Sequence, residues 1–120
     1  MALASDAALD GTLDIIASCT RVSACTSQPA NFAGIAAVSV GNYTLVGGDY
    51  TKANGDTSGR KISLGAKSGN NGTATGVANF LAYDDGVTLH WVTAASGDTV
   101  NSGSPWTIGA YKIAEVADPT

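Results

Sequence analysis

The chain has 120 residues, of which ten are acidic and six are basic, so its formal net charge is −4. This length suits one structural domain with its own hydrophobic core, and we expect residues 1–120 to form a single one. An acidic chain with few cations is a poor candidate for nucleic-acid binding, because contacts to phosphates need clustered basic residues. No apolar run reaches the roughly 18 residues of a membrane span. Asp6 and Asp10 do not fit a signal peptide.

Charged residues make up only 13% of the chain, and 15 glycines are present. Average domains carry about 25% charged residues. A surface with few charges and many small polar groups suits a β-rich, turn-rich protein that packs against its neighbours. The composition therefore favours a subunit of an assembly.

The first predicted element is a helix at about residues 5–18. Ser5 is a suitable N-cap, and Leu9, Leu13 and Ile16 fall on one apolar stripe. Asp6, Asp10 and Asp14 recur every four residues on a separate face. We interpret this face as solvated, with a basic partner as the alternative.

Residues 20–26 alternate and predict the first strand, which ends before Pro29. The following segment 30–40 is rich in Ala, with Phe32 as its only large residue, and both loop and strand remain open there. Residues 42–46 predict the next strand. We expect pairing to resume at residues 50–52.

Residues 60–67 alternate, so Ile62, Leu64 and Ala66 should face the core. A polar turn, Asn54 to Gly59, precedes this strand and should be free to meet a neighbour. The Gly- and Asn-rich link 68–72 then predicts a hairpin between this strand and the run 73–83.

A second hairpin should join residues 73–83 to 87–94 through the turn at Asp84-Asp85-Gly86. Residues 96–104 predict a polar loop, 106–113 the last strand, and 114–120 a short tail. The predicted fold class is mainly β: an antiparallel sandwich or barrel of about six to seven short strands with one N-terminal α-helix. The β-rich part is expected to span residues 20–113.

The chain holds two cysteines, Cys19 and Cys25. Two cysteines in a chain of this length do not make a disulfide scaffold. We interpret them as small buried thiols, with a bond between them as the alternative.

The residues do not indicate an enzyme. His90 is the only histidine, and the sequence supplies no partner that would position it as a catalytic base. We interpret it as a packing or surface residue. The glycine-rich stretches lack the spacing of a dinucleotide or phosphate loop, and the Cys and His residues lack zinc spacing. We therefore expect no catalytic, cofactor-binding or metal-binding residues.

Trp91, Trp106 and four tyrosines raise one further possibility, a sugar-stacking platform. Aromatic residues in a small β fold more commonly form the core or anchor an interface.

Several short motifs in shared order resemble a family of small virion structural proteins of tailed bacteriophages. The helix, Thr20-Arg21-Val22 and the stretch from Cys25 to Pro29 are similar to the start of that family. Its members also tend to end near an Asp-Pro pair, here Asp118-Pro119. The Ala-rich segment 30–40 departs from the family pattern. The central motifs are Asn54-Gly55-Asp56-Thr57-Ser58-Gly59-Arg60-Lys61 and Ala74-Thr75-Gly76-Val77-Ala78.

This resemblance implies a non-enzymatic part of the phage particle. We expect a capsid decoration or cement protein that binds and stabilises the assembled head; a tail or tail-fibre component with a host-glycan-binding role is the alternative. The expected partners are the phage major capsid protein and copies of the chain itself, in a trimer, within a virion assembled in the bacterial cytoplasm. The candidate interface residues are Arg60, Lys61, Trp106 and Tyr111.

Overall fold

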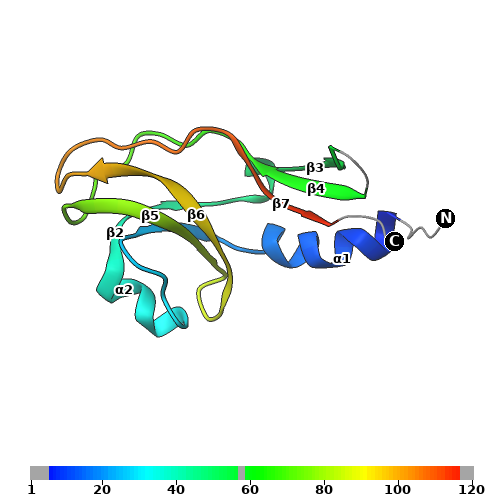
Figure 1. Ribbon diagram of the computed structural model, residues 1–120, viewed down its shortest axis with the longest axis horizontal. Helices are drawn as coiled ribbons and strands as arrows, with labels where there is room; N and C mark the ends of the chain where they lie inside the picture. The colour runs from blue at the N-terminus through cyan, green and yellow to red at the C-terminus, as the bar shows by residue number, and fades with distance from the viewer. Residues whose placement is uncertain (1–5, 57–58, 117–120) are drawn as a thin grey trace.

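The structure is a computed structural model that describes residues 6–56 and 59–116. Its strands form two antiparallel sheets (Figure 1). The first sheet has four strands in the order β2-β1-β5-β6, and the second has three in the order β3-β4-β7. The prediction of a mainly β protein with an N-terminal helix is therefore confirmed. The strands are β1 (Arg21–Cys25), β2 (Ser39–Thr44), β3 (Tyr50–Asn54), β4 (Arg60–Leu64), β5 (Gly76–Asp84), β6 (Leu89–Val100) and β7 (Tyr111–Val116).

Helix α1 (Asp6–Ala17) packs against the three-stranded sheet at one end of the molecule (Figure 1). Leu13 and Ile16 are buried, as the apolar stripe predicts. The predicted cap Ser5 and the side chain of Leu9 lie outside the described part. The opposite face of the helix carries Asp10 and Asp14, which are paired with basic side chains of the sheet.

The predicted hairpin between β5 and β6 is confirmed, with Tyr83 opposite Trp91. Strand β6 continues to Val100, so the predicted polar loop 96–104 is wrong in its first half. The register shifts between Ala78 and Phe80, where the segment between Ala94 and Asp98 faces a single residue of β5. A bulge of this kind lets polar residues extend a strand without breaking its pairing.

The predicted hairpin between β4 and β5 is wrong. Strand β4 pairs with β3 and β7, whereas β5 pairs with β1 and β6 in the other sheet. The link between them crosses from one layer to the other instead of turning back. Ile62 and Leu64 are buried as predicted, but Ala66 is exposed, because β4 ends at Leu64.

Beyond the three-stranded sheet, the second layer over the four-stranded sheet consists of two extended segments, residues 65–75 and 101–110. They are joined by isolated bridges, such as Lys67 with Ile108 and Asn71 with Pro105. Figure 1 shows them running above β5 and β6. The predicted last strand 106–113 is thus partly wrong: regular pairing begins only at Tyr111 and continues to Val116, into the predicted tail.

The Ala-rich segment 30–40 is neither a loop nor a strand in its centre. It forms a 3₁₀ turn η1 (Phe32–Gly34) and the short helix α2 (Ile35–Val38) on the outer face of the four-stranded sheet (Figure 1). Asn31 caps the turn, with its side-chain oxygen accepting from the Gly34 amide at 2.9 Å. Phe32, Ile35 and Val38 pack with Cys25 and Ala82 in a small second core.

The main core lies between the two layers and includes residues of α1 and of both sheets. Trp106 packs against Tyr43 with ring centroids 4.7 Å apart, and the Tyr43 hydroxyl donates to the Trp106 carbonyl. The indole also lies directly over Gly41. A Cβ atom on Gly41 would meet the indole at 2.7 Å, so only glycine fits at this point of β2.

We predict opposite effects for two glycine-to-alanine substitutions. Gly41→Ala should lower the free energy of unfolding by about 1–3 kcal/mol, because the new methyl group must displace the Trp106 ring. Gly11→Ala should raise it by about 1 kcal/mol, because a Cβ there meets nothing within 4 Å and alanine is the better helix former. Urea unfolding measures both. Equal effects of the two substitutions would contradict this account of the Gly41 contact.

Candidate interaction surface

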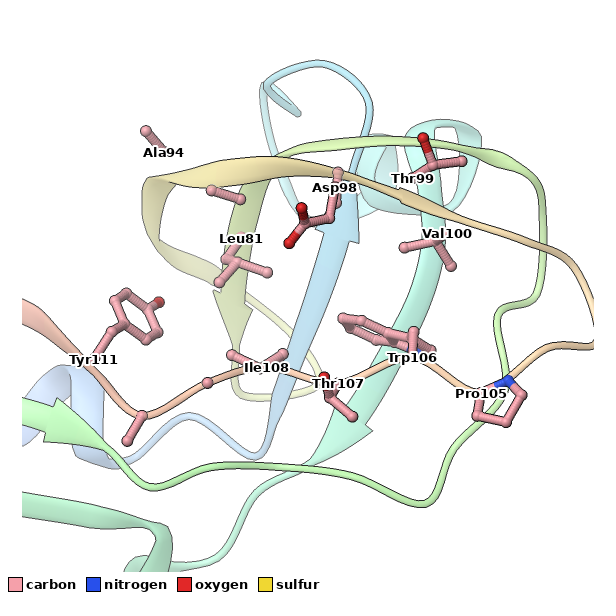
Figure 2. A pocket seen from close by; sticks show the side chains of 14 residues that line it. Leu81, Ala94, Asp98, Thr99, Val100, Pro105, Trp106, Thr107, Ile108 and Tyr111 are labelled. Carbon is pink, nitrogen blue, oxygen red and sulfur yellow. The ribbon is translucent and has the colours of Figure 1, made fainter.

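A groove of about 620 Å³ opens between β6 and residues 105–111 (Figure 2). One wall consists of sheet residues such as Leu81 and Val100. The other consists of Trp106, Ile108 and Tyr111. In Figure 2 Ile108 and Trp106 lie between their own segment and the sheet, and Asp98 and Thr99 lie along β6. The groove is thus an open side of the main core.

Two of the four predicted interface residues meet in this groove. Trp106 is only 9% exposed, and its indole nitrogen has no hydrogen-bond partner among the described residues. Tyr111 is half-buried, and its hydroxyl shares a hydrogen bond with that of Tyr83. Burial raises the pKa of Tyr111 to about 12. Both residues therefore contribute apolar surface to the groove and neutral groups to the core.

The other two predicted interface residues lie in β4 and are engaged within the chain. The Arg60 Nε donates to Asp10 at 3.0 Å, which ties β4 to α1. The Lys61 ammonium pairs with Asp56 at 2.6 Å. Their role in an interface stays a prediction, and the contacts show that both side chains already stabilise the monomer fold.

The same holds for the remaining cations. Each of the six basic residues pairs with a carboxylate of its own chain. A neutralised surface of this kind offers few charged groups to a partner. Contacts would have to come from apolar side chains, small polar side chains and backbone groups. The pairs are Arg21–Asp84, Lys52–Asp14, Arg60–Asp10, Lys61–Asp56, Lys67–Asp49 and Lys112–Asp56.

The turn predicted to meet a neighbour is at the surface in its described part. Asn54 and Asp56 are exposed, whereas residues 57 and 58 lie outside the described part. Asp56 accepts from both Lys61 and Lys112, and its amide donates to the Glu115 carboxylate. The hydrogen bonds from the two lysines lower the pKa of Asp56 to about 2. This network ties the turn to β4 and β7.

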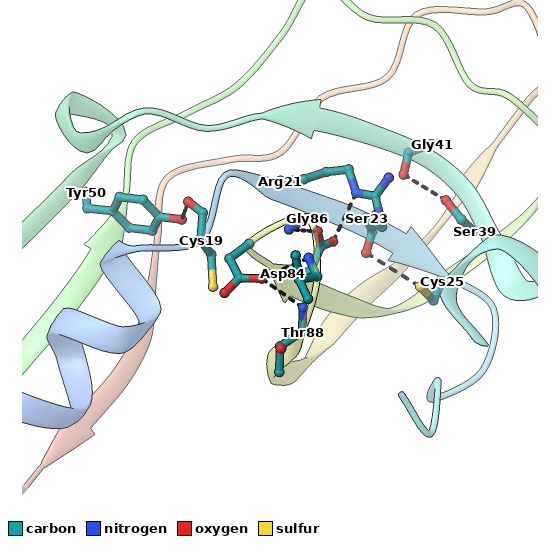
Figure 3. A network of polar contacts seen from close by, with 12 residues as sticks. Cys19, Arg21, Ser23, Cys25, Ser39, Gly41, Tyr50, Asp84, Gly86 and Thr88 are labelled. Carbon is teal, nitrogen blue, oxygen red and sulfur yellow. Dashed lines mark hydrogen bonds and ion pairs between the residues drawn. The ribbon is translucent and has the colours of Figure 1, made fainter. Parts of the chain in front are cut away.

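One buried ion pair joins the start of β1 to the end of β5 (Figure 3). Asp84 is fully buried and accepts from the Arg21 Nε and from the Gly86 amide, each at 3.0 Å. The Arg21 guanidinium also lies 5.5 Å above the Phe32 ring. The sequence reasoning treated Asp84 only as part of a turn signal, because its long-range partner cannot be read from local spacing.

The turn after β5 also accounts for the lone histidine. His90 Nε2 lies 2.9 Å from the Asp85 carboxylate, which accepts from the Val87 and Thr88 amides as well. The hydrogen bond from the Thr88 amide is the first cause that lowers the pKa of Asp85 to about 2, followed by that of His90. These bonds hold the β5–β6 turn, so His90 has a partner with a structural task.

A second, shallower hollow of about 390 Å³ lies beside this turn, between Phe32 and Leu89. Val87 at its rim is 78% exposed. Sequence reasoning missed this surface. The spacing of Phe32, Ile35 and Val38 is helical and was the signal that could have located it.

Cys19 and Cys25 are both buried and unbonded, as the simpler interpretation predicts. Burial raises the pKa of the Cys19 thiol to about 12 and that of Cys25 to about 11. Both thiols are therefore protonated and unreactive at neutral pH.

We predict that removing the cation of the buried pair costs more than removing that of an exposed one. Arg21→Met should lower the free energy of unfolding by about 2 kcal/mol, because Asp84 stays buried without its charged donor. Lys52→Met is the control, because its partner Asp14 is 58% exposed; it should cost no more than about 1 kcal/mol. Chemical denaturation compares the two. Similar costs would show that burial of Asp84 does not matter.

We also predict a pH-dependent contribution from Asp56. Its pKa falls from 3.8 to about 2 on folding, so its ion pairs stabilise the fold above pH 3.8 and are lost as the pH drops toward 2. Asp56→Asn should therefore be less stable than the natural chain at neutral pH. The difference should shrink in acid, as followed by thermal unfolding across this range. A difference that stays constant with pH would contradict the assignment.

Three searches of the described structure and of known proteins return nothing. Among the residues that the structure describes, no group of three or more His, Cys, Asp or Glu side chains is placed to hold a metal ion. None of the described helices is long and apolar enough to cross a membrane. No protein family, curated protein or solved structure matches this chain.

Proposed function

We propose that this chain is a non-enzymatic structural protein of a tailed-phage virion, and specifically a capsid decoration protein that binds and stabilises the assembled head. The assignment to a phage particle rests on the sequence resemblance of the helix and residues 20–29, 54–61, 74–78 and 118–119. The expected partners are the major capsid protein and further copies of the chain, in a trimer.

The observation that best supports a binding role is the pairing of every basic side chain within the chain. A protein neutralised in this way can pack closely against neighbours without burying unpaired cations, which would cost free energy. The apolar groove and exposed residues such as Val46 and Val87 then supply surface for contacts.

The mechanism that we propose is mass action. A protein that binds only the assembled shell stabilises it by RT ln(1 + [L]/Kd), which is about 2.7 kcal/mol per site at a hundredfold excess over Kd. Many weak sites on one shell would therefore add up to a large resistance to disruption. Neither a covalent step nor a cofactor is required.

The alternative, a tail or fibre component that binds host glycans, would use exposed aromatic residues. Of the aromatic residues predicted to form a stacking platform, Tyr43, Tyr83 and Trp106 are buried. Trp91, Tyr50 and Tyr111 are half-buried and pack against the main core. The burial of these rings favours the decoration role over glycan stacking.

The test of the proposal adds purified protein to phage heads that lack it. The protein should co-sediment with the heads and raise the temperature at which they break open. Because the cations are already paired, binding should change little between physiological salt and about 1 M salt, where the Debye length is near 3 Å. Loss of binding at high salt would point to a charged interface instead.

Absence of binding to heads would overturn the decoration role. Cryo-electron microscopy of the virion then separates the alternatives, since density on the head lattice supports decoration and density on the tail supports the second candidate. Binding to a glycan array, without binding to heads, would support the host-receptor role.

A further inference from the structure

We infer that the groove between β6 and residues 105–111 receives residues 1–5 of a second copy of this chain as an added β-strand. The inference deepens the self-association within the proposed function. It does not depend on capsid binding, because its test uses the purified chain alone.

One side of the groove is an open sheet edge. Strand β6 is the last strand of its sheet and pairs only with β5 among the described residues. Its outward backbone amides and carbonyls are therefore free to pair with another strand. An open edge of this length is a standard template for strand addition.

The opposite side is a second open edge. In the extended segment 105–110, the amides of Trp106 and Ile108 donate to Asn70 and Lys67, at 3.2 and 3.0 Å. Alternate residues of an extended chain direct their backbone groups to opposite edges. The backbone groups of Thr107 and Gly109 are therefore directed away from residues 67–70, toward the open side.

The lining of the groove defines the chemistry of the occupant. Small residues, among them Ala78, Ala94 and Ala95, alternate with Leu81, Val100 and Ile108, and the charged group is Asp98. A strand that fits must be apolar, with short side chains and no carboxylate close to Asp98. Residues 1–5, Met-Ala-Leu-Ala-Ser, meet this description. Residues 117–120 do not, because Asp118 is acidic and Pro119 has no amide to donate.

A chain cannot fill its own groove in this way. Helix α1 has 12 residues, is about 18 Å long, and runs toward β1 from the end of the molecule farthest from β6 (Figure 1). Five extended residues span at most about 17 Å, so they could return only to the far end of their own helix. The long axis of the molecule measures 51 Å. The strand must therefore come from another copy, in a head-to-tail contact that closes into a ring or extends as a filament.

The first experiment compares the full chain with a variant that lacks residues 1–5. Sedimentation velocity over a concentration series should show oligomers for the full chain and monomers for the deletion variant. Because a five-residue strand makes a small interface, we expect association in the micromolar range. Thermal unfolding of the deletion variant verifies that it is folded, since the main core does not include these residues.

The second experiment traps the contact. Leu3→Cys combined with Ala94→Cys, in the groove, should form disulfide-linked dimers and larger species on mild oxidation. Leu3→Cys combined with Thr44→Cys is the control, because Thr44 is an exposed residue of β2, at the opposite edge of the same sheet. The buried native thiols should not compete.

Three results would overturn the inference: a full chain that is monomeric at every concentration, a deletion variant that associates as the full chain does, or equal cross-linking of the two cysteine pairs. An oligomer that survives deletion would assign the contact to another surface. Capsid binding by a strictly monomeric chain would refute this inference while supporting the decoration role.

Discussion

The packing of Trp106 on Tyr43 over Gly41 holds the second layer of this protein in place. The segment that carries Trp106 has no regular pairing, only isolated bridges to residues 67–71. Backbone hydrogen bonds alone would hold such a segment weakly. The buried indole, its ring contact with Tyr43 and the bond from the Tyr43 hydroxyl fix it instead, and Gly41 makes room for the ring.

The groove is a consequence of this arrangement. Because residues 101–110 are anchored by inward side chains, they cover the four-stranded sheet without closing its β6 edge. A sandwich whose layers are both regular would expose two separate edges. Here one strand edge and one extended segment face each other across apolar side chains, which is the geometry that strand addition requires.

Electrostatics gives the surface a second property. Three of the ion pairs join α1 or the β5 end to distant strands: Asp10 with Arg60, Asp14 with Lys52, and Asp84 with Arg21. Two candidate interface residues, Arg60 and Lys61, are used in this way and link the parts of the monomer. Binding must then depend on shape and apolar contact, which is consistent with a subunit that packs in an ordered lattice.

Local patterns were sufficient for several elements. The apolar spacing of Leu13 and Ile16 predicted α1, alternation predicted the burial of Ile62 and Leu64, and the Asp-Asp-Gly turn predicted the β5–β6 hairpin. Each of these features depends on residues a few positions apart, so periodicity and turn chemistry determine them. The composition likewise indicated a surface with few charges.

Only the tertiary structure decided which strands are neighbours and which residues form the groove. Strand β1 lies between β2 and β5, and β4 lies between β3 and β7, so the link after β4 crosses layers where its glycines suggested a hairpin. Trp106 and Tyr111 were selected as separate aromatic residues, and the fold places both along one groove. The physical reason is that sheet order, ion-pair partners and groove walls depend on contacts between residues far apart in the chain, which local spacing does not encode.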